Sequence, residues 1–176
     1  MRTRQVDLTT DDLRAVVRFA VDCARDLLPE FESVAPDDPR PRDAIAAARA
    51  FADGAARSNL QRAAAFAAHR AARSVAVEPA RLAALACGDA AAAAYLHPIA
   101  EATQVGHILR AAACAARVVE MRTGATGDEA VGRLAERAAP PVPEVLGRYP
   151  AAPGGSTRVA ALMSALDSAI RERGRA

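Results

Sequence analysis

Three histidines, His69, His97 and His107, are the residues of this sequence best suited to acid–base chemistry or metal binding. A metal site on a helix typically places His or acidic side chains three or four residues apart, as in His-Glu-x-x-His, and that pattern does not occur in this sequence. His97 and Glu101 are four residues apart, but Pro98 lies between them and interrupts a shared helical face. We therefore expect mainly structural histidines. A metal site remains an alternative if the three converge in space.

A second group of polar residues follows helical spacing. Four side chains recur at i, i+4, i+7 and i+11: Arg62, Phe66, His69 and Arg73. Two guanidinium groups, an imidazole and a ring thus share one helix face. Because arginine stays charged and offers a forked pair of donors to oxyanions, this face is either a solvated rim or a polar surface that grips a carboxylate or a phosphate.

Residues 39–43 combine charge with local rigidity. Pro39 and Pro41 restrict the backbone at the start of a predicted helix, around Arg42 and Asp43. An acidic residue at this position is ordinarily explained by the positive end of the helix dipole, which accounts for Asp43. The role of Arg42 stays open.

Sequence motifs for other chemistry are missing. There is no glycine-rich phosphate loop after a strand, no Gly-x-Ser-x-Gly motif and no Cys-His pair at a recognisable spacing. Cys23, Cys87 and Cys114 are odd in number and far apart, which predicts reduced core thiols in a cytoplasmic protein. An enzymatic function therefore has little support, and we expect no cofactor.

Composition and charge narrow the class of partner. The 23 basic residues balance 21 acidic ones to a net charge of +2, which disfavours a nucleic-acid binder. The charge is uneven, because residues 1–38 hold five arginines and nine acids, whereas residues 39–77 hold seven arginines and two acids. This asymmetry either pairs neighbouring helices or forms a binding face for an acidic partner.

Neither secretion nor membrane insertion is expected. The N-terminal residues lack an apolar stretch of signal-peptide length. The most apolar later segment, residues 82–100, is interrupted by Asp89, His97 and Pro98.

The elements that must position these residues are predicted to be helices. Of the 176 residues, 48 are alanine and only six are aromatic, which favours an all-α single-domain bundle over a sheet. Periodicity and punctuation predict six or seven helices, near residues 10–28, 39–53, 58–75, 78–96, 103–122, 128–138 and 156–172, with one or two further turns at 143–147. We divide the chain into an N-terminal extension (1–8), a helical domain (9–149), a Pro/Gly linker (150–155) and a C-terminal helix (156–172) that packs on the same domain.

Several residues mark the predicted helix ends. Thr9 with Asp12, and Ser58 with Gln61, form capping boxes, and Ser156 is expected to cap the last helix. We expect the first helix to end or kink at Pro29. Gly88, inside a predicted helix, is either a weak point or a close helix contact.

Short motifs in order along the chain resemble a known family. They are Leu-Leu-Pro-Glu-Phe-Glu at residues 27–32, the segment 37–49 with its Pro-Arg-Pro-Arg-Asp, Ala-His-Arg-Ala-Ala-Arg at 68–73, Ala-Tyr-Leu-His-Pro at 94–98 and His-Ile-Leu-Arg-Ala-Ala at 107–112. These segments resemble the putative immunity proteins of bacterial toxin systems, specifically the immunity-protein-five-like family. The resemblance covers residues 8–121 and extends towards residue 170 through Arg-Tyr-Pro at 148–150 and the final helix.

The resemblance implies an all-α cytoplasmic protein that binds and neutralises a cognate toxin. Motif by motif, it carries over six positions as pocket or interface candidates: Arg42, Asp43, His69, Arg73, His97 and His107. The chain departs from the family pattern after Ala-Cys-Gly at 86–88, where relatives place a histidine and this sequence has Asp89. Asp89 thereby becomes a substitute ligand or a partner for His69.

The leading hypothesis is a non-catalytic protein that binds a toxin through a helical surface or pocket, with Arg62 added to the six candidates above. The alternative is a small helical metal- or ligand-binding protein or enzyme that uses His69, Asp89, His97 and His107. We expect no nucleic-acid or membrane partner. The scarcity of large side chains leaves open a helix face that pairs with a second copy of the chain.

Overall fold

The computed structural model describes residues 4–175, so residues 1–3 of the predicted N-terminal extension lie outside the described part. Within it there are nine α-helices: α1 (Thr10–Arg25), α2 (Leu28–Glu32), α3 (Arg40–Ala52), α4 (Asn59–Arg73), α5 (Glu78–Ala92), α6 (Val105–Thr123), α7 (Gly127–Ala135), α8 (Val142–Gly147) and α9 (Arg158–Arg173). Two 3₁₀ turns, Ala93–Tyr95 and Ala102–Gln104, connect α5 to α6. The predicted all-α class is confirmed, and the short α2 and α8 account for the higher number of helices.

The helix starts follow from local hydrogen bonding. Both predicted capping boxes are present, at Thr9 before α1 and at Ser58 before α4. The prediction for the last helix was wrong by one residue, because the side chain of Thr157, not Ser156, accepts the N–H of Ala160. The first helix ends at Arg25, shortly before Pro29, and Pro29 lies in the first turn of α2, which begins at Leu28, a position that proline fits.

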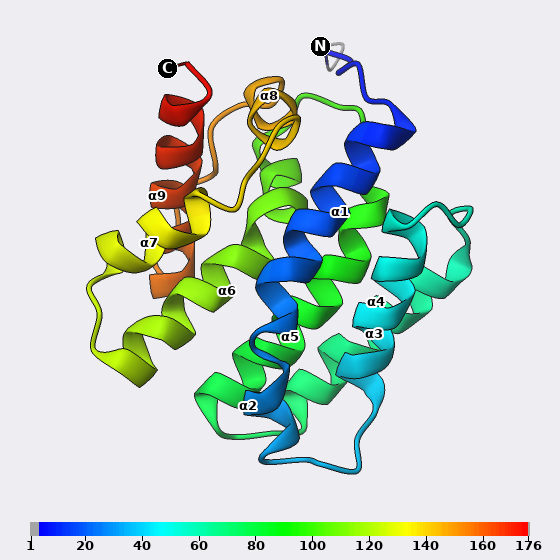
Figure 1. Ribbon diagram of the computed structural model, residues 1–176, viewed down its shortest axis with the longest axis vertical. Coiled ribbons are helices and arrows are strands. Elements are labelled where there is room, and N and C mark those ends of the chain that lie inside the picture. Colours follow the sequence, from blue (N-terminus) through cyan, green and yellow to red (C-terminus); the bar gives the residue numbers. More distant parts are fainter. Residues whose placement is uncertain (1–3, 176) are drawn as a thin grey trace.

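Helix α5 is the central element of the bundle. It packs against α1, α2, α3, α4 and α6, and most of its residues are buried. Figure 1 shows it behind α1, with α3 and α4 on one side and α6, α7 and α9 on the other. Its alanine-rich surface carries little side-chain bulk, so neighbouring helices approach its backbone closely.

The last helix packs on α6, α7 and α8. Residues 150–155, which precede it, form no regular secondary structure. The segment is nevertheless held in place, because the Asp167 carboxylate accepts the Ala152 N–H at 3.1 Å and the Arg171 guanidinium donates to the carbonyls of Tyr149 and Pro150. These contacts hold the segment against the C-terminal half of α9.

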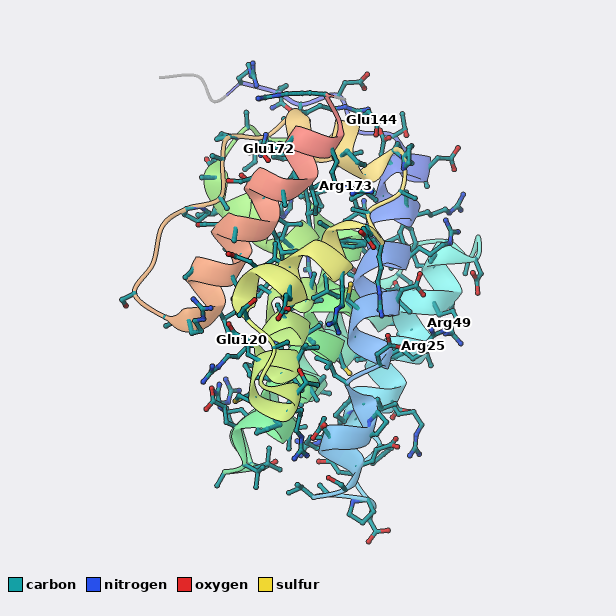
Figure 2. The ribbon with its side chains drawn as sticks, turned by 60° about the vertical axis from the view of Figure 1, so that its left-hand side comes forward. Arg25, Arg49, Glu120, Glu144, Glu172 and Arg173 are labelled. Carbon is teal, nitrogen blue, oxygen red and sulfur yellow. The ribbon has the colours of Figure 1, made fainter. Side chains whose placement is uncertain are left out.

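A group of charged residues, the Glu120 cluster, joins α6 to α9. The Glu120 carboxylate pairs with Arg158 of α9 and with Arg117 of its own helix, and Arg117 also approaches Glu78 at 3.6 Å. Figure 2 shows Glu120 where α6 and the start of α9 meet. Gly127 lies against this cluster, since an added Cβ would stand 2.4 Å from Nη2 of Arg158 and 2.8 Å from Oε1 of Glu120.

All three cysteines are free and buried, in agreement with the prediction of core thiols. Burial raises the pKa of Cys23 and of Cys87 to about 12, so both thiols stay protonated at neutral pH. Across residues 4–175, no helix combines the length and the apolar character needed to span a membrane.

Candidate functional site

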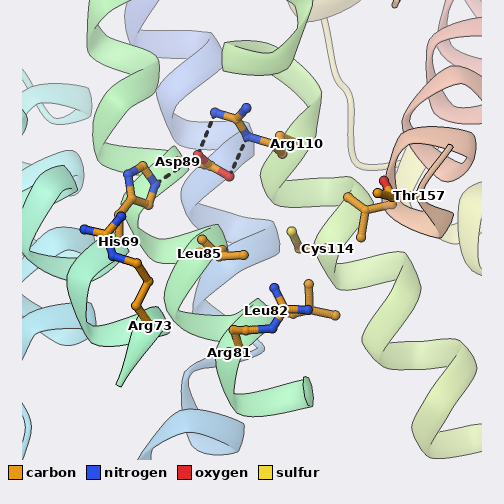
Figure 3. A pocket seen from close by; sticks show the side chains of 10 residues that line it. His69, Arg73, Arg81, Leu82, Leu85, Asp89, Arg110, Cys114 and Thr157 are labelled. Carbon is orange, nitrogen blue, oxygen red and sulfur yellow. Dashed lines mark hydrogen bonds and ion pairs between the residues drawn. The ribbon is translucent and has the colours of Figure 1, made fainter. Parts of the chain in front are cut away.

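A cavity of about 490 Å³ opens between four helices. Helix α4 contributes His69 and Arg73, while α6 contributes Arg110 and Cys114. The remaining lining residues come from α5 and from the start of α9: Arg81, Leu82, Leu85, Asp89, Thr157 and Val159. Figure 3 shows His69 and Arg110 meeting at Asp89, with Cys114 and Thr157 towards the opposite wall. This is the site at which candidate residues from distant motifs come together.

Asp89 organises the cavity. Its side chain is only 4% exposed, and its two oxygens accept Nε and Nη2 of Arg110 at 2.9 Å each. Nε2 of His69 lies 3.1 Å from Oδ1 of Asp89. A carboxylate paired with a guanidinium accepts hydrogen bonds, so His69 donates from Nε2. Asp89 thus orients two cavity residues at once.

Gly88 makes room for His69. A Cβ added at Gly88 would stand 2.4 Å from Cδ2 and 2.6 Å from Nε2 of His69, and 3.0 Å from the backbone oxygen of Ala65. The imidazole therefore rests directly on the backbone of α5. Of the two roles considered for Gly88 from sequence, the structure shows the close helix contact.

The cavity carries an excess of positive charge. Asp89 is its single acidic lining residue, against Arg73, Arg81 and Arg110. Between residues 4 and 175, neither Arg73 nor Arg81 has an ion-pair partner. The balance of the lining is therefore two positive charges before any contribution from His69.

Two arginines of the cavity, Arg81 and Arg110, were not among the site residues predicted from the sequence. Arg81, Leu85 and Asp89 stand at i, i+4 and i+8, so they share one face of α5. Arg110 and Cys114 are likewise four residues apart on α6. That spacing was a readable signal, but it points to a site only once Asp89 is known to face α4 and α6.

The outer face of α4 separates from the cavity. Phe66 is 58% exposed, and the neighbouring Arg62, Arg70 and Arg73 are exposed as well. Arg62 lies over the ring of Tyr95, 4.6 Å from its centroid. The predicted four-residue face is therefore divided, since His69 turns to Asp89 while Phe66 points to solvent.

The pair Arg42 and Asp43 lies away from the cavity, at the exposed start of α3. The Arg42 guanidinium bonds Oε1 of Glu32 through Nε at 2.9 Å and through Nη2 at 2.5 Å. Asp43 occupies the first turn of α3, as expected from the helix dipole. The structure thus does not bring these two residues to His69.

The other two histidines do not line the cavity either. His97 is exposed in the α5–α6 connection, where its backbone N–H bonds Gln104 and its carbonyl accepts the Tyr149 hydroxyl. His107 is half-buried on α6. Burial lowers its pKa below the ordinary value, and the charge of Arg110 lowers it further.

The structure does not gather the alternative set of metal ligands, His69, Asp89, His97 and His107, into one cluster. No group of three or more His, Cys, Asp or Glu side chains within the described residues is arranged to hold a metal ion. The oxygens of Asp89 are instead engaged by Arg110 and His69.

The lining of the cavity combines positive charge with an unreactive thiol. Burial raises the pKa of the Cys114 thiol, with Asp89 adding to the rise and Arg110 and Arg81 opposing it, so the sulfur stays protonated and is a poor nucleophile. Guanidinium groups with open donors bind oxyanions. The apolar side chains of Leu82, Leu85 and Val159 line the same space.

Comparison with known proteins gives one family match. Residues 7–139 match the family described as Imm-5 like putative immunity protein. This segment holds α1 to α7 and every cavity residue except Thr157 and Val159. No curated protein and no solved structure matches the chain.

Proposed function

Because the chain belongs to the family of Imm-5 like putative immunity proteins, we propose that it binds a cognate bacterial toxin and neutralises it by contact, without catalysis. The family match over residues 7–139 is the observation that carries this function. Three buried free thiols suit a reducing cytoplasm, which is where we place the encounter.

The outer face of α4 is the proposed contact surface. Helix α4 contains no acidic residue between Asn59 and Arg73. Arg62, Arg70 and Arg73 surround the exposed ring of Phe66 along this helix. Arginine and aromatic side chains are enriched among the residues that contribute most to binding energy in protein interfaces.

This charge pattern defines the partner. A surface with three arginines and no acid on its helix complements an acidic surface, and the exposed Phe66 ring requires an apolar recess on the partner. Two copies of the same α4 face would repel each other. We therefore infer an acidic toxin surface and not a two-fold contact between copies of this chain.

The test is co-expression with the toxins encoded beside the gene, with growth of the host as the readout. The unaltered chain should restore growth against its cognate toxin. The double variant Phe66→Ala, Arg70→Glu should lose at least about ten-fold in affinity for that toxin, since it removes the apolar anchor and reverses one charge. Val34→Ala, which truncates a side chain 42% exposed outside α4, is the matched control.

Two results would count against this function. Failure of the unaltered chain to protect against any neighbouring toxin would remove the neutralising role. Equal protection by the double variant and by the Val34 variant would leave the role intact but move the contact away from α4.

A further inference from the structure

The geometry of the cavity points to a second binding site, for a small ligand that carries a phosphate group and is about the size of a mononucleotide. This site adjoins the α4 face proposed for the toxin and shares Arg73 with it, whereas Arg81, Asp89 and Arg110 belong to the cavity and Phe66 to the toxin face. It lies between α4, α5, α6 and the start of α9, where the cavity volume is about 490 Å³. Pockets for small ligands typically measure roughly 300–1,000 Å³.

The first support is positive charge that the protein itself leaves unpaired. Half of the arginines in residues 4–175 pair with a carboxylate, as Arg122 does with Glu30 and Arg137 with Asp26. Arg73 and Arg81 have no such partner among residues 4–175, although both line the cavity. An anion entering the cavity would supply the missing counter-charge.

The second support is the orientation of Arg110. It binds Asp89 through its Nε and Nη2 edge, with both hydrogen bonds at 2.9 Å. The Arg110 side chain is 47% exposed, and its Nη1 lies on the side of Gly106, beyond the edge that binds Asp89. Asp89 therefore fixes the position of the Arg110 charge at the wall of the cavity.

The third support comes from α9. Thr157 and Val159, at the first turn of this sixteen-residue helix, form part of the cavity wall. The amino end of a helix carries partial positive charge from its free N–H groups, which favours phosphate. Together with three arginines it provides positive potential from more than one wall of the cavity.

Charge and shape select the chemical class. Three guanidinium groups against the single carboxylate of Asp89 leave a balance of +2, which matches the dianion of a phosphate monoester better than a single carboxylate. Leu82, Leu85 and Val159 offer apolar contact for the rest of the ligand.

Calorimetric titration of the full chain tests the site. The probes are adenosine 5′-monophosphate, inorganic phosphate, adenosine and phthalate, which separate the phosphate group from the apolar body and from a dicarboxylate. We expect the nucleotide to bind most tightly, inorganic phosphate more weakly, and adenosine and phthalate least. Added salt should weaken nucleotide binding because the attraction is electrostatic.

Variants locate the binding. Arg81→Met keeps the length of the side chain and removes a charge without stranding a buried carboxylate, so the fold should persist. It should weaken nucleotide binding by about ten-fold or more, as expected for a charge-assisted hydrogen bond, and Arg73→Met should act in the same direction. Arg49→Met, on the exposed end of α3 away from the cavity, is the control and should bind as the unaltered chain does (Figure 2).

The inference is overturned if no phosphate compound binds at millimolar concentration, if phthalate or adenosine binds as tightly as the nucleotide, or if the Arg81 and Arg49 variants bind alike. Circular dichroism of each variant checks its fold. If the Arg81→Met variant does not fold, nucleotide binding by the Arg73→Met variant tests the site in its place. Toxin protection is a separate measurement. Phe66→Ala should keep nucleotide binding, and Arg81→Met should keep protection, so either function can fail alone.

Discussion

The Asp89 cluster, which consists of His69, Asp89 and Arg110, is built much like the Glu120 cluster but differs from it in charge balance. Each surrounds a largely buried carboxylate, 4% exposed for Asp89 and 10% for Glu120, with arginine from another helix. Each also rests against a glycine whose Cβ would collide with the cluster, Gly88 in one case and Gly127 in the other. In both clusters, a carboxylate paired with arginine joins two helices at a point where a glycine leaves room for the charged side chains.

The difference is whether the charges are balanced. Around Glu120, two arginines face two carboxylates, because Glu78 also approaches Arg117. Around Asp89, one carboxylate serves Arg110 while Arg73 and Arg81 stay unpaired and a cavity remains between the helices. The balanced charges around Glu120 need no further partner. The unpaired arginines beside the Asp89 cavity can still bind an anionic ligand.

The largest difference in stability between the two clusters should appear when each glycine is replaced by alanine. Gly88→Ala should lower the free energy of unfolding by about 3 kcal/mol, since the new Cβ collides with the His69 ring and approaches the Ala65 backbone oxygen. Gly127→Ala meets only the ends of side chains, and the exposed Arg158 can swing aside, so its loss should be far smaller. Urea denaturation measures both, and equal losses would contradict the distinction.

Neutralising each carboxylate should cause the next largest loss in the free energy of unfolding. Asp89→Asn should cost about 2 kcal/mol in urea denaturation, because it leaves Arg110 without its charge partner, and the half-exposed guanidinium limits the loss. Glu120→Gln should cost less at pH 7. The hydrogen bond from Arg158 holds the pKa of Glu120 below its ordinary 4.5, so this stabilisation is present above pH 4.5 and is lost as the pH falls through the lowered pKa. If the stability of the Glu120→Gln variant falls with decreasing pH as steeply as that of the unaltered chain, Glu120 does not cause this pH dependence.

His107, one turn before Arg110, should add a smaller dependence on pH. Burial, then Arg110 and His97, lower its pKa, with Asp89 opposing them. The unfolded chain therefore binds a proton more readily, and stability should decrease as the pH falls below the ordinary value of 6.5. His107→Gln should reduce the difference between unfolding free energies at pH 7.5 and pH 5.5. An unchanged difference would mean that other groups cause it.

The smallest effect is expected at Arg42. Its ion pair with Glu32 is largely exposed, so Arg42→Ala should change the free energy of unfolding by about 0.5 kcal/mol or less. Nucleotide binding should also stay unchanged, because Arg42 does not line the cavity. A clear loss of nucleotide affinity would move the binding site towards α3 and remove the contrast between the clusters.

Local signals predicted the helices well. Thr9, Ser58 and the residues three positions after them form capping boxes, which depend only on neighbours in sequence. Pro29 was harder to place, since proline fits both the end of one helix and the first turn of the next. The outcome there depends on how α2 packs on α5, which periodicity does not encode.

The cavity was predicted only in part. His69, Arg73 and Asp89 were found from type, spacing and resemblance, and the structure brings them together. Arg81 and Arg110 were missed because alanine-rich helices give little sign of which face turns inward. The contact between His69 and Asp89 depends on the close approach of α4 to Gly88, a tertiary feature.

The family match covers only part of the cavity wall. Eight of its ten lining residues fall inside the family-matched segment 7–139, whereas Thr157 and Val159 come from α9, beyond it. Substitutions in α9 would therefore reshape one wall while the Asp89 cluster on α4, α5 and α6 stays intact. A change in the shape of the cavity can therefore come from α9 alone, because the arginines and Asp89 lie on the other three helices.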